Sequence, residues 1–277
     1  MSQQKVWFIT GISRGLGRAL AEGMLAAGDH VIGTTRSGAA DFSHERLTVL
    51  PLEVTDAAQA ADTVAKAHAV HGRVDVVVNN AGYGLLGPVE ATAPREYEHL
   101  MNVNFDGTVR VTQAALPLLR QQPGGGHIIN MSSIAGLAPS GGYAFYAAAK
   151  FAVVGFSVAL AQEVAPLGVR VTCVAPGAFR TDFLDDSSIR WTEKELEPYA
   201  ESRRAVQQHF ETMAGKQLGD PARATDALRK LVASDNPPRV LLLGSDAVER
   251  WRAMNGELTS DIDAWQGVSV STDFSND

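Results

Sequence analysis

The chain has 277 residues, and its 24 Lys and Arg against 31 Asp and Glu give a formal charge of −7. This acidic balance argues against a nucleic acid or an anionic membrane surface as the partner, because both attract a clustered positive field. The single cysteine, Cys173, excludes an internal disulfide and an all-cysteine metal site. We therefore expect a protein of a reducing compartment, the cytoplasm.

No run of about 18 apolar residues stands out, so we expect no transmembrane helix. Short apolar, β-branched runs instead recur along the chain and predict strands. Several of them are apolar at successive positions, which is typical of strands that are covered on both faces. The predicted strands are residues 6–9, 31–35, 47–52, 74–78, 128–131, 169–174 and 240–243.

Amphipathic stretches separate these runs and predict helices. The clearer ones are residues 17–27, 56–71, 94–119 and 143–165, and the weaker ones are 192–214, 221–233 and 246–256. Alternating strands and helices require right-handed crossovers and a parallel sheet. The sequence therefore predicts an α/β fold over residues 1–277: a single doubly wound Rossmann domain with about seven parallel strands and helices on both faces.

The first predicted strand runs into a glycine-rich turn with the sequence TGISRGLG. Gly11 allows a sharp turn, Gly15 lets the backbone approach a pyrophosphate, and Gly17 permits close packing of the following helix. The N-terminus of that helix offers free N–H groups to phosphates. The alternative is a tight strand–helix turn without a ligand, but a first βα unit is the context that a dinucleotide site requires. Ser13, Arg14 and Leu16 belong to the same turn.

The second predicted strand ends without the carboxylate that would hold a ribose 2′-hydroxyl and reject a 2′-phosphate. Thr35 and Arg36 stand there instead, and Arg14 is a second cation within reach. Two guanidinium groups around a phosphate give charge-assisted contacts. We therefore expect NADP(H) in preference to NAD(H), with solvated surface arginines as the alternative interpretation of both residues.

Tyr146 and Lys150 lie four residues apart in a predicted helix, which places them on one helical face. A cation beside a phenol lowers the pKa of the tyrosine and suits it for proton transfer. None of the other tyrosines in the chain has a lysine four residues later. The pair is therefore the candidate acid–base centre.

Five motifs occur in one order: the glycine turn, Asn79-Asn80-Ala81-Gly82, Ser133, Tyr146 with Lys150, and Pro176-Gly177. In this order the chain resembles the single-domain short-chain dehydrogenase/reductases over about residues 5–243. Its overall sequence is similar to that of the hydroxysteroid- and retinol-dehydrogenase-like members. The resemblance implies an NAD(P)-dependent enzyme that oxidises alcohols or reduces carbonyls.

The resemblance also implies roles for individual residues. Tyr146 matches the catalytic acid/base, and Lys150 matches the residue that lowers its pKa and holds the nicotinamide ribose. Ser133 matches the serine that binds the substrate carbonyl, whereas its neighbour Ser132 is expected to pack or cap. Asn104 matches the helix asparagine that holds a water of the proton relay.

The resemblance also implies which residues contact the cofactor. Asn80, Ala81 and Gly82 match the turn beside the adenosine ribose, and Pro176, Gly177 and Thr181 match the segment near the nicotinamide. Glu53-Val54 stands where the family usually has Asp-Val beside the adenine, which leaves that contact open.

Two segments have a predicted role beyond the site: the aromatic-rich residues 179–215 as a substrate lid, and residues 244–277 as a C-terminal extension. His68 and His71 are three residues apart, a spacing at which two histidines could bind one metal. A solvated helix end accounts for both residues, so we expect no metal. The acidic residues Asp182, Asp185 and Asp186 are expected to be a solvated loop face.

The expected function is interconversion of a carbonyl and a primary or secondary alcohol of a small molecule. A nucleotide-binding sensor or scaffold and a dehydratase or isomerase of the same fold are the alternatives. The predicted helices 94–119 and 143–165 are apolar on more than one side, so we also expect a homodimer or homotetramer.

Overall fold

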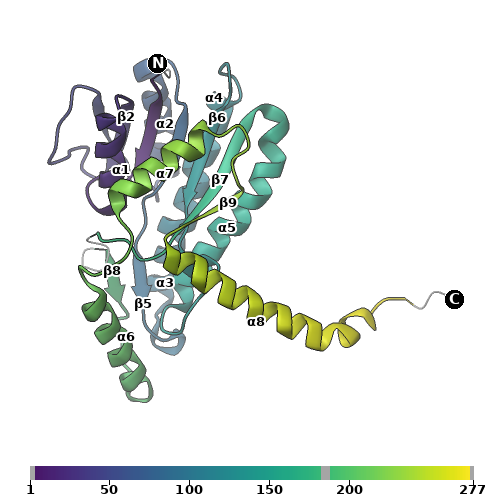
Figure 1. The fold of residues 1–277 in the computed structure, drawn as a ribbon. Coiled ribbons are helices and arrows are strands. Elements are labelled where there is room, and N and C mark those ends of the chain that lie inside the picture. The colour runs from purple at the N-terminus through teal and green to yellow at the C-terminus, as the bar shows by residue number, and fades with distance from the viewer. Residues whose placement is uncertain (1–3, 182–187, 275–277) are drawn as a thin grey trace.

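The seven predicted strands form one parallel sheet in the computed structural model, which describes residues 4–181 and 188–274. The order is β3-β2-β1-β4-β6-β7-β9 (Figure 1), so the chain winds one way from β1 to β3 and the other way from β4 onwards. The strands are β1 Val6–Thr10, β2 His30–Thr35, β3 Leu47–Pro51, β4 Val76–Asn79, β6 Gly126–Met131, β7 Val169–Pro176 and β9 Val240–Leu243. This confirms the predicted fold class.

Both faces of the sheet are covered by helices, because successive residues of each central strand are apolar. On β1, Phe8 packs into the core under α2, α4 and α5, whereas Trp7 and Ile9 pack into the core under α1 and α7. The covering helices are α1 Gly15–Ala26, α2 Ala57–His71, α4 Gly107–Leu119, α5 Ala144–Val164 and α7 Pro221–Ala233. The predicted start of α2 shifts by one residue, since Asp56 is its N-cap and accepts from the N–H of Gln59 at 3.0 Å.

The predicted helix 94–119 is interrupted by a π-helical turn. It consists of α3 Pro94–Met101, the π-turn η2 Asn102–Asp106, and α4. The expectation of one uniform α-helix is wrong here. A π-turn shifts the register of the residues on either side of it and is frequent at functional sites, and the candidate residue Asn104 lies in it.

A second, two-stranded parallel sheet was not predicted. It pairs β5 Gly84–Leu86 with β8 Ile189–Trp191. The helix expected over 192–214 is shorter, α6 Ala200–Met213, because residues 197–199 form a 3₁₀ turn around Pro198. The acidic residues Asp182, Asp185 and Asp186 lie outside the described residues. Further 3₁₀ turns are η1 Val89–Ala91, η3 Ile134–Gly136 and η4 Ala165–Leu167.

The C-terminal helix is much longer than predicted. Instead of residues 246–256, α8 covers Ser245–Val270 and projects away from the rest of the molecule (Figure 1). Ala247 is its one buried residue.

One stretch of the described chain, Ala144–Leu167, is long and apolar enough to cross a membrane, with a mean hydropathy of 1.7. Lys150, Gln162 and Glu163 interrupt this stretch, so it contains no unbroken run of about 18 apolar residues. The stretch is mostly α5, whose residues Val153, Leu160 and Val164 are buried in the fold. Burial against the sheet explains its composition, because a core helix passes the same test of length and hydropathy.

A buried histidine lies in the centre of the sheet. His127 on β6 is fully buried, and its Nε2 is 2.9 Å from the hydroxyl of Thr172 on β7. That hydroxyl donates to the carbonyl of Pro238, so it accepts from Nε2–H, and among the described residues Nδ1 has no partner. Burial lowers the pKa of His127 to about 3.

This histidine makes the folded state sensitive to acid. Between about pH 6.5 and pH 3 the unfolded chain binds a proton at His127 that the folded chain excludes, so stability falls as the pH falls through this window. We expect His127→Gln, which keeps a donor for Thr172, to reduce the slope of unfolding free energy against pH by up to about 1.4 kcal/mol per pH unit. Urea unfolding at pH 7, 6, 5 and 4 measures the slope, and equal slopes for both proteins would contradict the assignment.

Candidate active site

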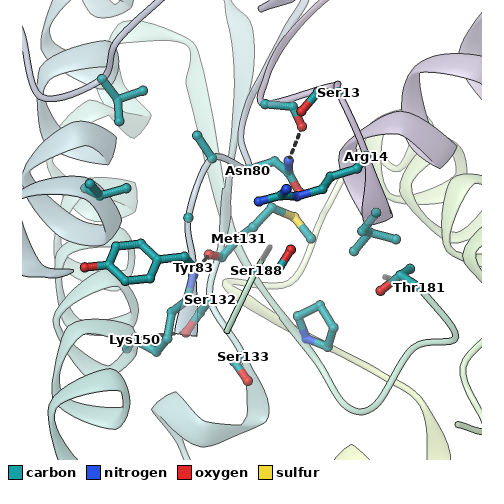
Figure 2. Close-up of a pocket in the computed structure, with 18 of the residues that line it drawn as sticks. Ser13, Arg14, Asn80, Tyr83, Met131, Ser132, Ser133, Lys150, Thr181 and Ser188 are labelled. Carbon is teal, nitrogen blue, oxygen red and sulfur yellow. Dashed lines mark hydrogen bonds between the residues drawn. The ribbon is translucent and has the colours of Figure 1, made fainter. Parts of the chain in front are cut away.

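A pocket of about 370 Å³ opens at the carboxyl ends of the central strands. Figure 2 shows its labelled side chains around one space, with Ser13 and Arg14 on the glycine-turn side and Ser132, Ser133 and Lys150 on the other. All of the candidate site residues except Gly17 and Asn104 line it. They are Gly11, Ser13, Arg14, Gly15, Leu16, Arg36, Glu53, Val54, Asn80, Ala81, Gly82, Ser133, Tyr146, Lys150, Pro176, Gly177 and Thr181.

The glycine turn joins β1 to α1 with the geometry that an anion site requires. Gly11 and Gly15 have φ values of 74° and 60°, which residues with a side chain rarely adopt. Nothing lies within 4 Å of a Cβ placed on Gly15, whereas one on Gly17 would lie 2.2 Å from the Gly11 carbonyl oxygen. The N-cap residue of α1, Arg14, makes no side-chain cap hydrogen bond. The helix therefore presents open N–H groups and its positive dipole end to the pocket.

Asn80 braces this turn from the neighbouring strand. Its Nδ2 donates to the carbonyls of Thr10 and Gly11 at 2.9 and 3.0 Å, and its own N–H donates to the Thr10 hydroxyl at 2.9 Å. The family resemblance predicts Asn80 beside a ribose, and its side-chain amide also holds the glycine turn in place.

The two candidate phosphate ligands come from different segments: Arg36 follows β2, and Arg14 belongs to the glycine turn between β1 and α1. Arg36 is exposed and Arg14 is half-buried, and both line the pocket. Glu53, at the end of β3, turns one carboxylate oxygen toward its own loop, where it accepts from the N–H and hydroxyl of Thr55 at 3.2 and 3.0 Å. This oxygen is thus engaged locally, while Glu53 and Val54 both line the pocket.

Tyr146 and Lys150 lie together on the pocket side of α5. Nζ of Lys150 is buried, donates to the Met131 carbonyl at 2.9 Å and lies 5.9 Å from the centre of the Tyr146 ring. Burial raises the pKa of Tyr146 to about 12, and a hydrogen bond with Ser133 opposes the rise. Burial lowers the pKa of Lys150 to about 8. Burial is the dominant effect on the Tyr146 phenol here, and Nζ of Lys150 is tied to the Met131 carbonyl, so a lowering of the Tyr146 pKa by Lys150 stays a prediction.

The two adjacent serines have different surroundings. Ser133 caps the turn η3, where its Oγ accepts from the Ala135 N–H at 3.2 Å, and it faces Tyr146. Ser132 is buried and donates to the Lys150 carbonyl at 2.9 Å. Ser132 therefore ties β6 to α5, which agrees with the packing role expected for it, and it also borders the pocket.

Asn104 stands behind the pocket wall. Its Oδ1 accepts from the Tyr83 N–H at 3.0 Å and its Nδ2 donates to the Tyr83 carbonyl at 2.8 Å. A Cβ on Gly82 would lie 3.0 Å from Asn104 Oδ1 and 3.6 Å from Lys150 Nζ. These two bonds hold the pocket wall close to Lys150, and because an asparagine amide can make up to four hydrogen bonds, binding of a relay water by Asn104 stays a prediction.

The family model described as short chain dehydrogenase matches residues 5–190. The chain belongs to this family. It is 38% identical over 274 residues, 97% of this chain and 99% of the relative, to the oxidoreductase BOA17 of Botryotinia fuckeliana.

Two solved structures are similar to this chain in fold and sequence. A short-chain dehydrogenase from Streptomyces avermitilis superposes with a TM-score of 0.90 at 37% identity, covering 99% of this chain and 100% of the other. ElxO with NADP bound gives a TM-score of 0.73 at 26% identity, with 89% and 100% covered. This short-chain dehydrogenase is therefore an NAD(P)-dependent oxidoreductase.

Several side chains support the pocket of the short-chain dehydrogenase in ways that the sequence did not predict, although Asn79 belongs to one of its motifs. Asp246, at the start of α8, accepts from the Ala178 N–H at 2.7 Å and packs on Gly177, whose Cβ would lie 2.3 Å from its oxygens. The C-terminal segment thus supports the Pro176–Gly177 turn. Asn79, Asn130 and Ser157 form a buried chain of hydrogen bonds of 2.8 and 2.9 Å that joins β4, β6 and α5.

The wall opposite the glycine turn includes residues from the small sheet. Tyr83 directly precedes β5, and the guanidinium of Arg190 on β8 lies 4.9 Å from the centre of its ring. Burial raises the pKa of Tyr83. Further lining residues outside the predicted site are His99, Met131, Phe179, Ser188 and Gln217. Phe179 and Ser188 belong to the predicted lid segment 179–215, whereas no motif marks the other three, which tertiary packing brings to the pocket.

His68 and His71, which were considered as metal ligands, do not line this pocket. His71 packs against His30 with ring centres 4.4 Å apart, and burial lowers its pKa. Among the described residues no three His, Cys, Asp or Glu side chains gather as metal ligands would.

Proposed function

We propose that this short-chain dehydrogenase interconverts a carbonyl and a primary or secondary alcohol of a small molecule with NADP(H). One observation carries the proposal: Tyr146, Ser133 and Lys150 meet in the same pocket that begins at the glycine turn. Nucleotide binding and proton transfer then take place at two ends of one space. A sensor without turnover would need only the nucleotide end.

The pocket residues fit such a dinucleotide. The open N–H groups of α1 suit the pyrophosphate, and the clearance at Gly15 allows the close approach. Arg36 and Arg14 suit a 2′-phosphate, and ElxO, a related protein, has been solved with NADP bound. NAD(H) is the alternative cofactor. When bound, the nicotinamide supplies or accepts the hydride.

The residues near α5 would handle the proton. Ser133 and the Tyr146 hydroxyl would bind the carbonyl oxygen, and fixed donors there stabilise the charge that develops on it. Because burial raises the pKa of Tyr146 to about 12, the phenol is protonated near neutral pH and can act as the acid in carbonyl reduction. Lys150 would hold the nicotinamide ribose, and Asn104 would act as a positioning residue behind it. The reverse direction uses the same groups.

Deleting the Tyr146 hydroxyl tests the proposed chemistry. We expect Tyr146→Phe to keep NADPH affinity within about threefold while turnover falls by a factor of about 10² to 10⁴, the range of one positioned acid–base group. NADPH fluorescence titration measures binding, and NADPH loss against a panel of ketones and aldehydes measures turnover. Wild-type turnover in Tyr146→Phe would refute the mechanism. Binding without turnover of any compound by the wild type would instead favour the sensor.

Deleting Arg36 tests the cofactor choice. Loss of a hydrogen bond to a charged group costs about 1.5–3 kcal/mol, so we expect Arg36→Ala to weaken NADPH binding about 10- to 100-fold and to leave NADH binding nearly unchanged. Arg229→Ala, on the exposed surface of α7, is the control with the same charge change. An unchanged NADPH/NADH ratio in Arg36→Ala would exclude Arg36 as the 2′-phosphate ligand.

We also propose that the protein is a homo-oligomer, with a dimer preferred. The outer face of α5 carries Phe151, which is 44% exposed, beside exposed Ala148, Gly155 and Ala159. A helix that is apolar on its outer side calls for a cover. The cytoplasm remains the proposed location, in keeping with one buried cysteine. The lid role of residues 179–215 likewise remains a proposal.

Light scattering after size exclusion at micromolar concentration tests the assembly. We expect a mass of at least twice 29.5 kDa, because closed two-fold pairing is the commonest arrangement. A single species at the mass of one chain would refute it.

A further inference from the structure

Gln217 brings a buried and unpaired amide to the pocket wall. It lies between α6 and α7, is 2% exposed and lines the pocket. Among the described residues, its Oε1 accepts no hydrogen bond. Other buried side chains in this part of the chain also have an unpaired atom, but none of them lines the pocket. A buried amide oxygen without a donor costs stability, so it calls for a partner from outside the chain.

The backbone around Gln217 is fixed to the segment that follows β7. The Gly219 N–H donates to the Ala178 carbonyl at 2.9 Å, and the Arg180 N–H donates to the Gly219 carbonyl at 2.8 Å. The guanidinium of Arg180 also donates to the backbone carbonyl of Gln217 at 3.2 Å. These three bonds hold Gln217 in place, so the unpaired oxygen is a built feature of the wall.

This attachment places Gln217 at the end of the pocket where we expect the nicotinamide. Phe179 and Gly219 form a parallel bridge. In that register Gln217 lies beside Gly177, two residues earlier on each segment. The family resemblance predicts Gly177 and Thr181 near the nicotinamide, and both line the pocket with Gln217.

The nicotinamide carries one group that suits an unpaired acceptor. The pyrophosphate offers only acceptors, which an amide oxygen repels, and the nicotinamide ribose is assigned to Lys150. The carboxamide offers two N–H donors. It is also neutral, so its pairing with a neutral, buried oxygen requires no charge to be desolvated.

We propose that Oε1 of Gln217 accepts a hydrogen bond from the carboxamide of the bound nicotinamide. The bond restricts rotation of the nicotinamide ring and satisfies the buried amide at the same time. It presupposes the proposed NADP(H) binding, to which it adds a contact that no motif of the sequence marks. The cost of the unpaired oxygen in the free protein is recovered when the cofactor binds.

A cycle of two changes tests the bond, one in the protein and one in the ligand. Gln217→Met keeps an unbranched side chain of similar length without the amide. The 3-acetylpyridine analogue of NADP⁺ has a methyl group in place of the carboxamide NH₂. We expect the preference of the wild type for NADP⁺ over this analogue to fall by a factor of about 3 to 10 in Gln217→Met, the scale of one neutral hydrogen bond. Titration calorimetry measures the four affinities without turnover.

Thermal unfolding without ligand gives a second readout. Replacing an unpaired buried amide by an apolar side chain removes its desolvation cost, so we expect Gln217→Met to raise Tm by about 2 °C or more. A glutamine with only a structural role would lower Tm on replacement. Gln121→Met, in the exposed turn after α4, is the matched control and should change neither Tm nor the ligand preference.

A second variant separates the reach of the amide from its polarity. Gln217→Asn keeps the amide but withdraws it by one methylene group, so it should lose the same preference without the gain in Tm. An unchanged preference in both variants would overturn the contact and leave the proposed function standing. A raised KM for the carbonyl substrate in Gln217→Met, with unchanged NADP⁺ affinity, would overturn it too and assign the amide to the substrate. A wild type that binds neither NADP⁺ nor NAD⁺ would overturn the proposed function and the contact together.

Discussion

The site depends on how the ends of β1 and β4 are tied together. The Thr10 hydroxyl at the end of β1 accepts the N–H groups of Asn80 and Ala81 at 2.9 and 3.0 Å, and Asn80 returns its side-chain amide to the carbonyls of Thr10 and Gly11. These bonds cross the point where the winding of the sheet reverses. A crevice at such a switch point exists in every open α/β sheet. Here the tie sets its shape, since it fixes the glycine turn against the strand that leads to Gly82.

A second constraint couples the proposed acid–base residues to the sheet. Lys150 donates to the Met131 carbonyl, and Ser132 donates to the Lys150 carbonyl, so α5 and the end of β6 hold each other through two polar bonds. Ser133 follows at once, and its orientation is set by the turn η3 that it caps. The three residues of the proposed chemistry thus come from two elements whose relative position is fixed by hydrogen bonds rather than by loops.

The sequence predicted the sheet because Trp7, Phe8 and Ile9 leave no polar side on the strand, and it predicted the glycine turn because Gly11 and Gly15 need positive φ. It did not predict what depends on packing at a distance. The β5–β8 pair is three residues long on each strand and has no period to detect. The π-turn at Asn104 has helical composition throughout. The pKa of Tyr146 depends on burial, which spacing to Lys150 cannot report.

The small sheet of β5 and β8 has a consequence for how this pocket can change. Neither strand pairs with the seven-stranded sheet, yet Tyr83, Ser188 and Arg190 beside them line the pocket. The proposed nucleotide end and the proposed acid–base residues are built on the main sheet and its helices, whereas this wall is built on a separate pair of short strands. Substitutions in that pair can therefore reshape the pocket while the residues of the proposed chemistry keep their positions. One half of the pocket is thus fixed by the main sheet, and the other half can change its side chains independently.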